Sequence, residues 1–197
     1  FAAATLEGRI VTLEPLEERH FAGLLAVGLA PDLWRWTIDR LETEGDMRRW
    51  LDDTLAEQAD GRSIPFATVE RASGRVVGST RFGQLDPENR HVEIGWTWVG
   101  SEWQRTAVNT ECKYLLLKHA FETLGVIRVQ LKTDSRNVRS QKAIERIGGV
   151  KEGTLRNHMI LPDGLFRHSV FYSILDSEWG SVKKNLEEMM KKYEMGK

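Results

Sequence analysis

The chain has 197 residues, of which 41% are hydrophobic and 29% charged, and its formal net charge is −1 at pH 7. These values are ordinary for a soluble globular chain, and the near-neutral charge argues against a general nucleic-acid binder. The single cysteine, Cys112, excludes an internal disulfide and a cysteine zinc site. The sequence has no run of about 18 apolar residues, so no membrane partner is expected. We expect a cytoplasmic location.

Two periodicities predict the elements. Alternating apolar and β-branched residues indicate strands, and apolar residues at a spacing of three to four indicate helices. The elements are a strand at 9–16, helices at 17–29 and 46–58, strands at 65–71, 76–85 and 91–99, a helix after the loop at 104–109, a strand at 126–133, a helix capped by Asn137, strands at 153–161 and 167–175, and a C-terminal helix over 177–197. This mixed order predicts an α/β or α+β single domain over 1–197, with residues 1–5 disordered or left from trimming of the chain.

The strand at 91–99 carries a carboxylate near its centre. In strict alternation, one face is apolar and consists of Val92, Ile94, Trp96 and Trp98. Glu93 lies on the opposite face, and burying a carboxylate there costs free energy unless it is paired or hydrated. Glu93 is therefore either a salt-bridged or surface residue, or a general base that faces a water-filled cleft.

This strand leads through the loop at 104–109 into a helix. The first N–H groups of a helix lack internal partners and its dipole favours negative charge, so an anion can bind there. Arg105 adds a guanidinium, which suits phosphate, and Thr106 adds a hydroxyl. The loop has neither a Walker lysine pattern nor a complete GxGxxG, so plain architecture is the alternative. Cys112 lies on the apolar stripe and is interpreted as a core residue, and the spacing of the five histidines predicts no metal site.

Several segments in order resemble a known family. They are QRTAVNTECKYLLLKHAFE, TDSRNVRSQKAIERIG, KEGTLRNHMILPDG and RHSVFYSIL, followed by EW. From about Leu6 to Trp179 the chain is similar to the GNAT acetyltransferase superfamily, and within it to the Rim-type branch of ribosomal-protein N-terminal acetyltransferases. The resemblance implies a twisted mixed sheet of about seven strands flanked by helices, in which a splayed pair of central parallel strands holds acetyl-CoA.

The resemblance also implies the site residues. The pantetheine arm would pair with Thr97, Trp98 and Val99 like an added strand, and the Val99 N–H would polarise the thioester carbonyl. The pyrophosphate would rest on Gln104, Arg105, Thr106, Ala107, Val108 and Asn109. Asn137 and Ser140 match positions near the thiol end of the cofactor. Glu93 would be the general base, and Ser140 or a water would protonate the leaving thiolate.

The chain departs from the family pattern in two places. Arg105 and Ala107 stand where the family usually carries glycines, which permit close backbone approach and positive φ. A charge-assisted contact from Arg105 can compensate. Ile144 stands where many members place a tyrosine acid, but a thiol of pKa about 8.5 leaves without a strong acid near neutral pH.

The expected function is acetyl-CoA-dependent N-acetylation, with direct transfer to a primary amine such as a protein N-terminal α-amine. One alternative acceptor is a small-molecule amine: a polyamine, an antibiotic or an amino-acid analogue. Another alternative is a non-catalytic CoA-binding module, which a distorted loop at Arg105 and Ala107 would favour. The expected partners are acetyl-CoA and the acceptor, with no metal and no nucleic acid, and a homodimer is left open.

Overall fold

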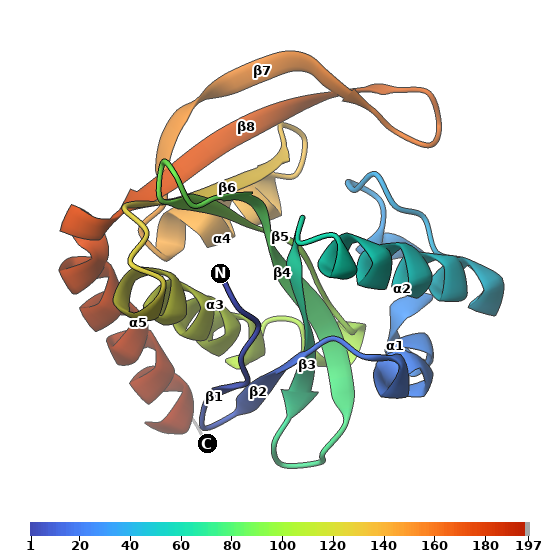
Figure 1. Ribbon diagram of the computed structural model, residues 1–197, viewed down its shortest axis with the longest axis horizontal. Coiled ribbons are helices and arrows are strands. Elements are labelled where there is room, and N and C mark those ends of the chain that lie inside the picture. The colour runs from blue at the N-terminus through green and yellow to red at the C-terminus, as the bar shows by residue number, and fades with distance from the viewer. Residues whose placement is uncertain (196–197) are drawn as a thin grey trace.

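The computed structural model describes residues 1–195, which form one mixed sheet with helices on both faces (Figure 1). The sheet has eight strands in the order β1-β2-β3-β4-β5-β6-β8-β7. The strands are β1 Leu6–Glu7, β2 Val11–Pro15, β3 Ile64–Glu70, β4 Val76–Asp86, β5 His91–Val99, β6 Arg128–Asp134, β7 Val150–Ile160 and β8 Phe166–Leu175. Neighbouring strands are antiparallel except β5 and β6, which are parallel. The predicted fold class is confirmed, and the short β1 raises the expected seven strands to eight.

The helices agree with the sequence pattern except at their ends. They are α1 Phe21–Gly28, α2 Glu44–Ala59, α3 Val108–Lys118, α4 Val138–Arg146 and α5 Asp176–Met195. The helix expected at 17–29 begins as a 3-10 turn, and α3 continues as a π-helical turn over His119–Thr123. Residues 196–197 of the expected C-terminal helix lie outside the described residues.

Helix caps explain two of these boundaries. The Thr43 side chain accepts a hydrogen bond from the Asp46 N–H, and the Asp46 carboxylate accepts one from the Thr43 N–H. This capping box starts α2 two residues before the predicted position. Asn137 caps α4 as predicted, because its side chain accepts from the Ser140 N–H at 3.1 Å.

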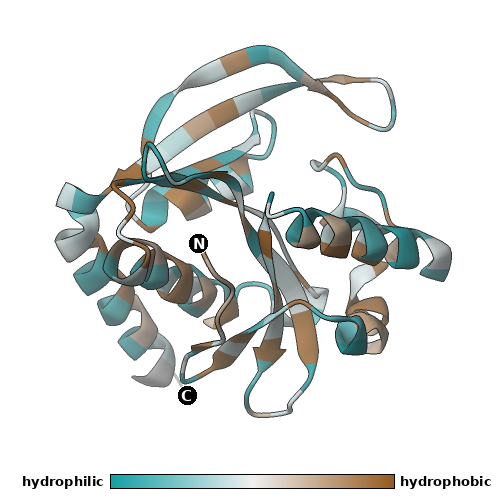
Figure 2. Ribbon diagram, viewed as in Figure 1, coloured by the Kyte–Doolittle hydropathy of each residue, from teal (hydrophilic) through white to brown (hydrophobic). Residues whose placement is uncertain are grey.

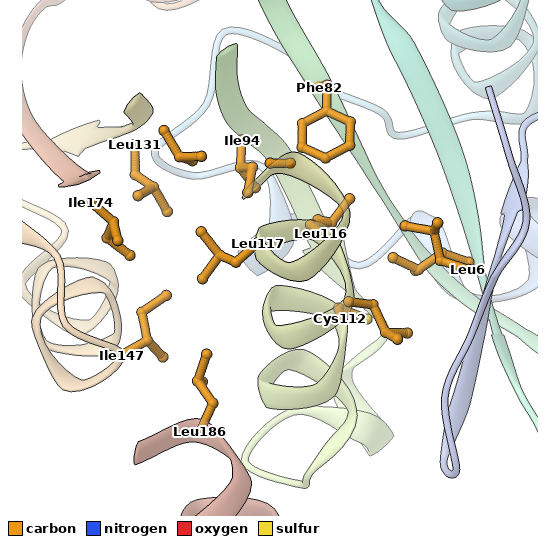
Figure 3. Close-up of a cluster of buried hydrophobic side chains, with 14 of the residues drawn as sticks. Leu6, Phe82, Ile94, Cys112, Leu116, Leu117, Leu131, Ile147, Ile174 and Leu186 are labelled. Atoms are coloured by element: carbon orange, nitrogen blue, oxygen red, sulfur yellow. The ribbon is translucent and has the colours of Figure 1, made fainter. Parts of the chain in front are cut away.

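Two hydrophobic clusters lie on opposite faces of the sheet. The larger packs α3, α4 and α5 against the strands, and Figure 3 shows Leu116 and Leu117 of α3 between strand residues and Leu186 of α5. Cys112 belongs to this cluster, as its place on the apolar stripe predicts. The smaller packs α1 and α2 around Trp98. In Figure 2 the hydrophobic colour is frequent on α3 and the central strands, whereas much of α2 is hydrophilic. No helix within residues 1–195 is both long and apolar enough to cross a membrane.

A buried carboxylate fixes the start of the chain to α3. Glu111 accepts hydrogen bonds from the backbone N–H groups of Arg9, Ile10 and Val11 at 2.7–2.9 Å. Gly8 leaves room for this contact, since a Cβ there would lie 2.4 Å from the Glu111 carboxylate. The N-terminal strands therefore hold the first turns of α3 in place.

The strand β5 changes face part-way along its length. Its register against β4 shifts between Ser79 and Arg81, and Trp96 has a φ of +48°. A bulge adds one residue and so reverses the alternation beyond it. Ile94 and Val99 consequently belong to the larger cluster, whereas Trp98 belongs to the smaller one. The predicted single apolar face from Val92 to Trp98 is therefore wrong.

Candidate active site

A gap opens where β5 leaves β6. The two strands pair at only three positions, the last being Glu93 with Gln130. On the other side of β5, the Gly100 N–H donates to the Val77 carbonyl at 2.8 Å. Hydrogen-bonded pairs alternate along an antiparallel ladder, so the N–H and C=O of Val99 point away from β4 and into the gap. The Val99 carbonyl accepts from the Gln104 amide at 3.1 Å, which leaves its N–H to face the gap.

The loop before α3 closes without glycine. Arg105 has a φ of +62°, in the left-handed region that glycine adopts most readily, whereas Ala107 has an ordinary helical φ of −70°. The Thr106 hydroxyl donates to the Trp103 carbonyl at 2.7 Å and accepts from the Val108 N–H at 3.3 Å. Of the two positions where the family usually has glycine, Arg105 alone adopts a backbone conformation that is costly for a residue with a Cβ.

Two polar residues one turn apart on α3 share a face directed at β5. The buried Asn109 Oδ1 has no hydrogen-bond partner in the described part of the chain. Lys113 is 8% exposed, and its ammonium donates to Thr97 Oγ1 at 2.8 Å. The Thr97 hydroxyl oxygen also lies 2.8 Å from Thr80 Oγ1. Burial lowers the pKa of Lys113 to about 8, and no carboxylate within residues 1–195 lies within 4.0 Å of its ammonium. An unpaired amide oxygen and an ammonium without a counter-ion fit a polar or anionic ligand.

The start of α4 lies beside this loop. Arg139 of α4 donates to Gln104 Oε1 at 2.8 Å and so links the two segments. The Asn137 oxygen is committed to capping α4, and the Ser140 hydroxyl makes no hydrogen bond with the described residues. Ile144 packs in the larger cluster, so the position of the family's tyrosine supplies no acid here.

Glu93 is buried at the closed end of the gap, with an exposed fraction of 1%. Its carboxylate accepts from the Gln130 amide at 2.8 Å and from the Lys132 ammonium at 3.0 and 3.1 Å. It is therefore a salt-bridged residue rather than a surface residue. Gly95 lies next to the carboxylate, where an added Cβ would lie 3.1 Å from Oε1. The role of Glu93 as a base stays a prediction.

Further polar residues share this face of the sheet, opposite α3. We use the name polar face for the surface formed by Glu93, Gln130, Lys132, His158, Arg167 and Ser169. Burial and then the positive charges of Lys132 and Arg167 lower the pKa of His158, which favours the neutral imidazole near pH 7. His158 also lines a hollow of about 810 Å³ on the β7–β8 hairpin, with Thr154, Leu155, Arg156, Asn157 and His168.

The fold agrees with that of known proteins. Residues 11–150 match the family model described as the acetyltransferase (GNAT) domain. The chain belongs to the GNAT acetyltransferase family. The crystal structure of a GCN5-related N-acetyltransferase from Brucella melitensis is 32% identical, with a TM-score of 0.89 over 96% of this chain and 86% of that one.

Two curated relatives carry ribosomal names. The chain is 33% identical over 110 residues to "Putative ribosomal N-acetyltransferase YdaF" of Bacillus subtilis (strain 168), covering 56% of this chain and 59% of that protein. It is 22% identical to the "Ribosomal-protein-serine acetyltransferase" of Escherichia coli (strain K12), covering 70% and 75%. The names support the Rim-type branch of the GNAT family. The chain spans about three-fifths of the length of the first curated relatives that it matches.

The structure brings most of the residues predicted from the sequence to one gap. Thr97 to Val99 border it on β5, 104–109 border it at the start of α3, and Asn137 and Ser140 lie at the start of α4. The sequence reasoning missed Lys113 and Lys132, and it considered His158, with His91 or a water, only as a substitute base if Glu93 proves structural. The sequence did contain a signal for Lys113, because this lysine interrupts an apolar helix. It lies four residues after Asn109, so the two side chains share one face of that helix. The sequence around Lys132 gave no such signal, since strand register decides which groups its side chain approaches.

The buried ammonium of Lys113 predicts an unusual pH dependence of stability. Its pKa is lowered on folding, so the unfolded chain binds more protons between about pH 8 and 10.5, and stability rises with pH across that window. Lys113→Met should raise the free energy of unfolding at pH 7 by up to about 3 kcal/mol, and this gain should shrink towards pH 10.5. Urea unfolding at several pH values measures it, with the exposed Lys118→Met as control. A gain that does not change with pH would contradict the prediction.

Proposed function

We propose that this chain is an acetyl-CoA-dependent N-acetyltransferase that transfers an acetyl group directly to a primary amine, with a protein N-terminal α-amine as the favoured acceptor. The observation that carries the proposal is the gap between β5 and β6, bordered by the inward-facing Val99 N–H and by the start of α3. Membership of the GNAT family supports it.

The residues around the gap fit acetyl-CoA. The free N–H groups at the start of α3 and the Arg105 guanidinium suit the pyrophosphate. The unpaired Asn109 Oδ1 and the ammonium of Lys113 offer an acceptor and a donor beside β5. Thr97, Trp98 and Val99 would hold the pantetheine arm along the strand edge that β6 leaves free.

Each step of the chemistry has a candidate residue. Acetyl-CoA supplies the acetyl group as a thioester. The Val99 N–H would donate to the carbonyl oxygen as negative charge develops there. Glu93 would take the proton of the acceptor amine, directly or through a water, because the carboxylate lies where β5 and β6 separate. The Ser140 hydroxyl, or a water, would pass a proton to the leaving thiolate and take one back from solvent.

The geometry of the loop bears on the non-catalytic alternative. That alternative needs a loop distorted by Arg105 and Ala107. Arg105 instead adopts the left-handed conformation that a glycine would adopt, and Ala107 is helical. The loop therefore supports a working cofactor site. The acceptor is inferred from the relatives named for ribosomal proteins, and a small-molecule amine is the alternative that an acceptor screen tests.

Acetyl-CoA should bind in the micromolar range and raise the melting temperature. A ligand at 100 times its Kd stabilises by about 2.7 kcal/mol, which is roughly 5–10 °C for a chain of this size. Release of free CoA thiol should require an added peptide or amine. No thermal shift at millimolar acetyl-CoA would contradict cofactor binding, and a shift without turnover on any amine would favour the non-catalytic module.

Glu93→Gln should lower turnover at pH 7 by roughly 10²-fold, the scale of losing a general base, with little change in acetyl-CoA affinity. The deficit should shrink as the pH rises, because the acceptor amine then loses its proton without help. Glu152→Gln is the matched control, since it also breaks an ion pair, with Arg128. Wild-type turnover of Glu93→Gln at pH 7 would make Glu93 structural and direct attention to His158.

A further inference from the structure

Arg167 is a buried arginine on the polar face. It lies on β8, two residues before Ser169, and is 7% exposed. Val170, Tyr172 and Ile174 of the same strand face the larger cluster. Since side chains alternate along a strand, Arg167 and Ser169 point to the opposite side of the sheet from α3.

Its contacts are with neutral groups. The guanidinium Nε donates to Ser169 Oγ at 3.1 Å, and a terminal nitrogen lies 3.4 Å from the Trp36 carbonyl oxygen. No carboxylate within residues 1–195 lies within 4.0 Å of it. Asp134 and Glu93 act on it from farther away, and each is bound to another cation, Arg136 or Lys132 respectively.

The other buried arginine in the described chain shows what a structural role requires. Arg81 is 4% exposed, and its guanidinium donates to the Glu57 carboxylate at 2.7 Å and to Thr54 Oγ1 at 2.9 Å. A buried charge without such a partner is costly to maintain. Within the described residues, Arg167 keeps Nη2 without a partner, and its Nη1 meets only the Trp36 carbonyl oxygen at 3.4 Å. A planar guanidinium placed in this way suits a planar anion such as a carboxylate.

The position of Arg167 connects it to the acceptor side of the gap. Ser169 Oγ, which accepts from Arg167, also lies 2.9 Å from His158 Nδ1. His158 lines the hollow on the β7–β8 hairpin, and the charges of Glu93 and Lys132 both influence its pKa. The proposed pyrophosphate site at the start of α3 is on the other side of the sheet. An anion at Arg167 would therefore belong to the acceptor rather than to the cofactor.

We propose that Arg167 binds a carboxylate of the acceptor, so that this chain acetylates an amine that carries a carboxylate nearby. This inference rests on the proposed function. The carboxylate can be the α-carboxylate of a free amino acid or an acidic side chain at a peptide N-terminus. The shared chemistry is a cationic or neutral amine joined to an anion that pairs with the guanidinium.

Two matched substrate pairs separate these sources. Alanine and alaninamide differ at the α-carboxylate, and the tripeptide amides Glu-Ala-Ala and Gln-Ala-Ala differ at the first side chain. The measurement is kcat/KM from release of free CoA thiol, expressed per free amine from a pH profile. The acidic member of at least one pair should be preferred by about 10-fold or more, because a site built for a polar group rejects an analogue that lacks it.

Arg167→Gln should remove that preference, mainly through KM, and should change kcat/KM for the neutral members by less than about 3-fold. Arg167→Lys keeps the charge without the planar fork and should retain part of the preference. Arg156→Gln is the matched control, because Arg156 is an exposed arginine of the same hairpin and lines the hollow beside His158. Thermal unfolding of each variant shows whether it folds, and the wild-type preference does not depend on any variant.

The outcomes distinguish this proposal from the proposed function. Turnover by the wild type with equal kcat/KM for acidic and neutral members would overturn the role of Arg167 and leave the acetyltransferase function standing. An equal loss on both members in Arg167→Gln, or a larger loss of preference in Arg156→Gln, would also overturn it. Absence of turnover with every amine would defeat the proposed function, and this inference with it.

Discussion

The whole site depends on the short pairing between β5 and β6. Three pairs of residues hold the strands together, and beyond Glu93 they separate. The bulge at Trp96 turns the strand at that point, with a backbone conformation that a bulky residue rarely adopts. The ring of Trp96 lies over Gly83, where an added Cβ would lie 2.5 Å from it, and this packing holds the bulge. If β5 and β6 stayed paired along their whole length, β6 would occupy the strand edge at Val99, and the Val99 N–H could not bind a ligand.

The charges around the gap differ between the two faces of the sheet. On the polar face, Glu93 is neutralised by Lys132, whereas Arg167 keeps an unsatisfied charge. On the α3 face, Lys113 is buried against Thr97 without a counter-ion. Both cations reduce stability in the unliganded protein unless a ligand compensates them. Such a cost is common at sites that must bind charged groups, and it supports the proposal that the cofactor binds on one face and the acceptor on the other.

The sequence predicts the fold well because its local signals agree with the tertiary structure. The strand at 91–99, the Asn137 cap and the place of Cys112 in the core all follow from periodicity and capping. The bulge could not be predicted, because the sequence around Gly95 and Trp96 also fits strict alternation. The cofactor residues were predicted from a family resemblance, because periodicity alone does not show that these segments lie together in the fold. The partners of Glu93 and the unpaired state of Arg167 depend on register and on Trp36, which is distant in sequence.

We propose that the gap edge of β5 binds acetyl-CoA through the Val99 N–H. Amide hydrogen exchange measured by NMR, with and without acetyl-CoA, tests this most directly. Exchange at Val99 should slow strongly on binding, whereas exchange at Trp98, whose N–H bonds to β4, should change much less. Unchanged exchange at Val99 with saturating acetyl-CoA, or equal slowing at Val99 and Trp98, would contradict it.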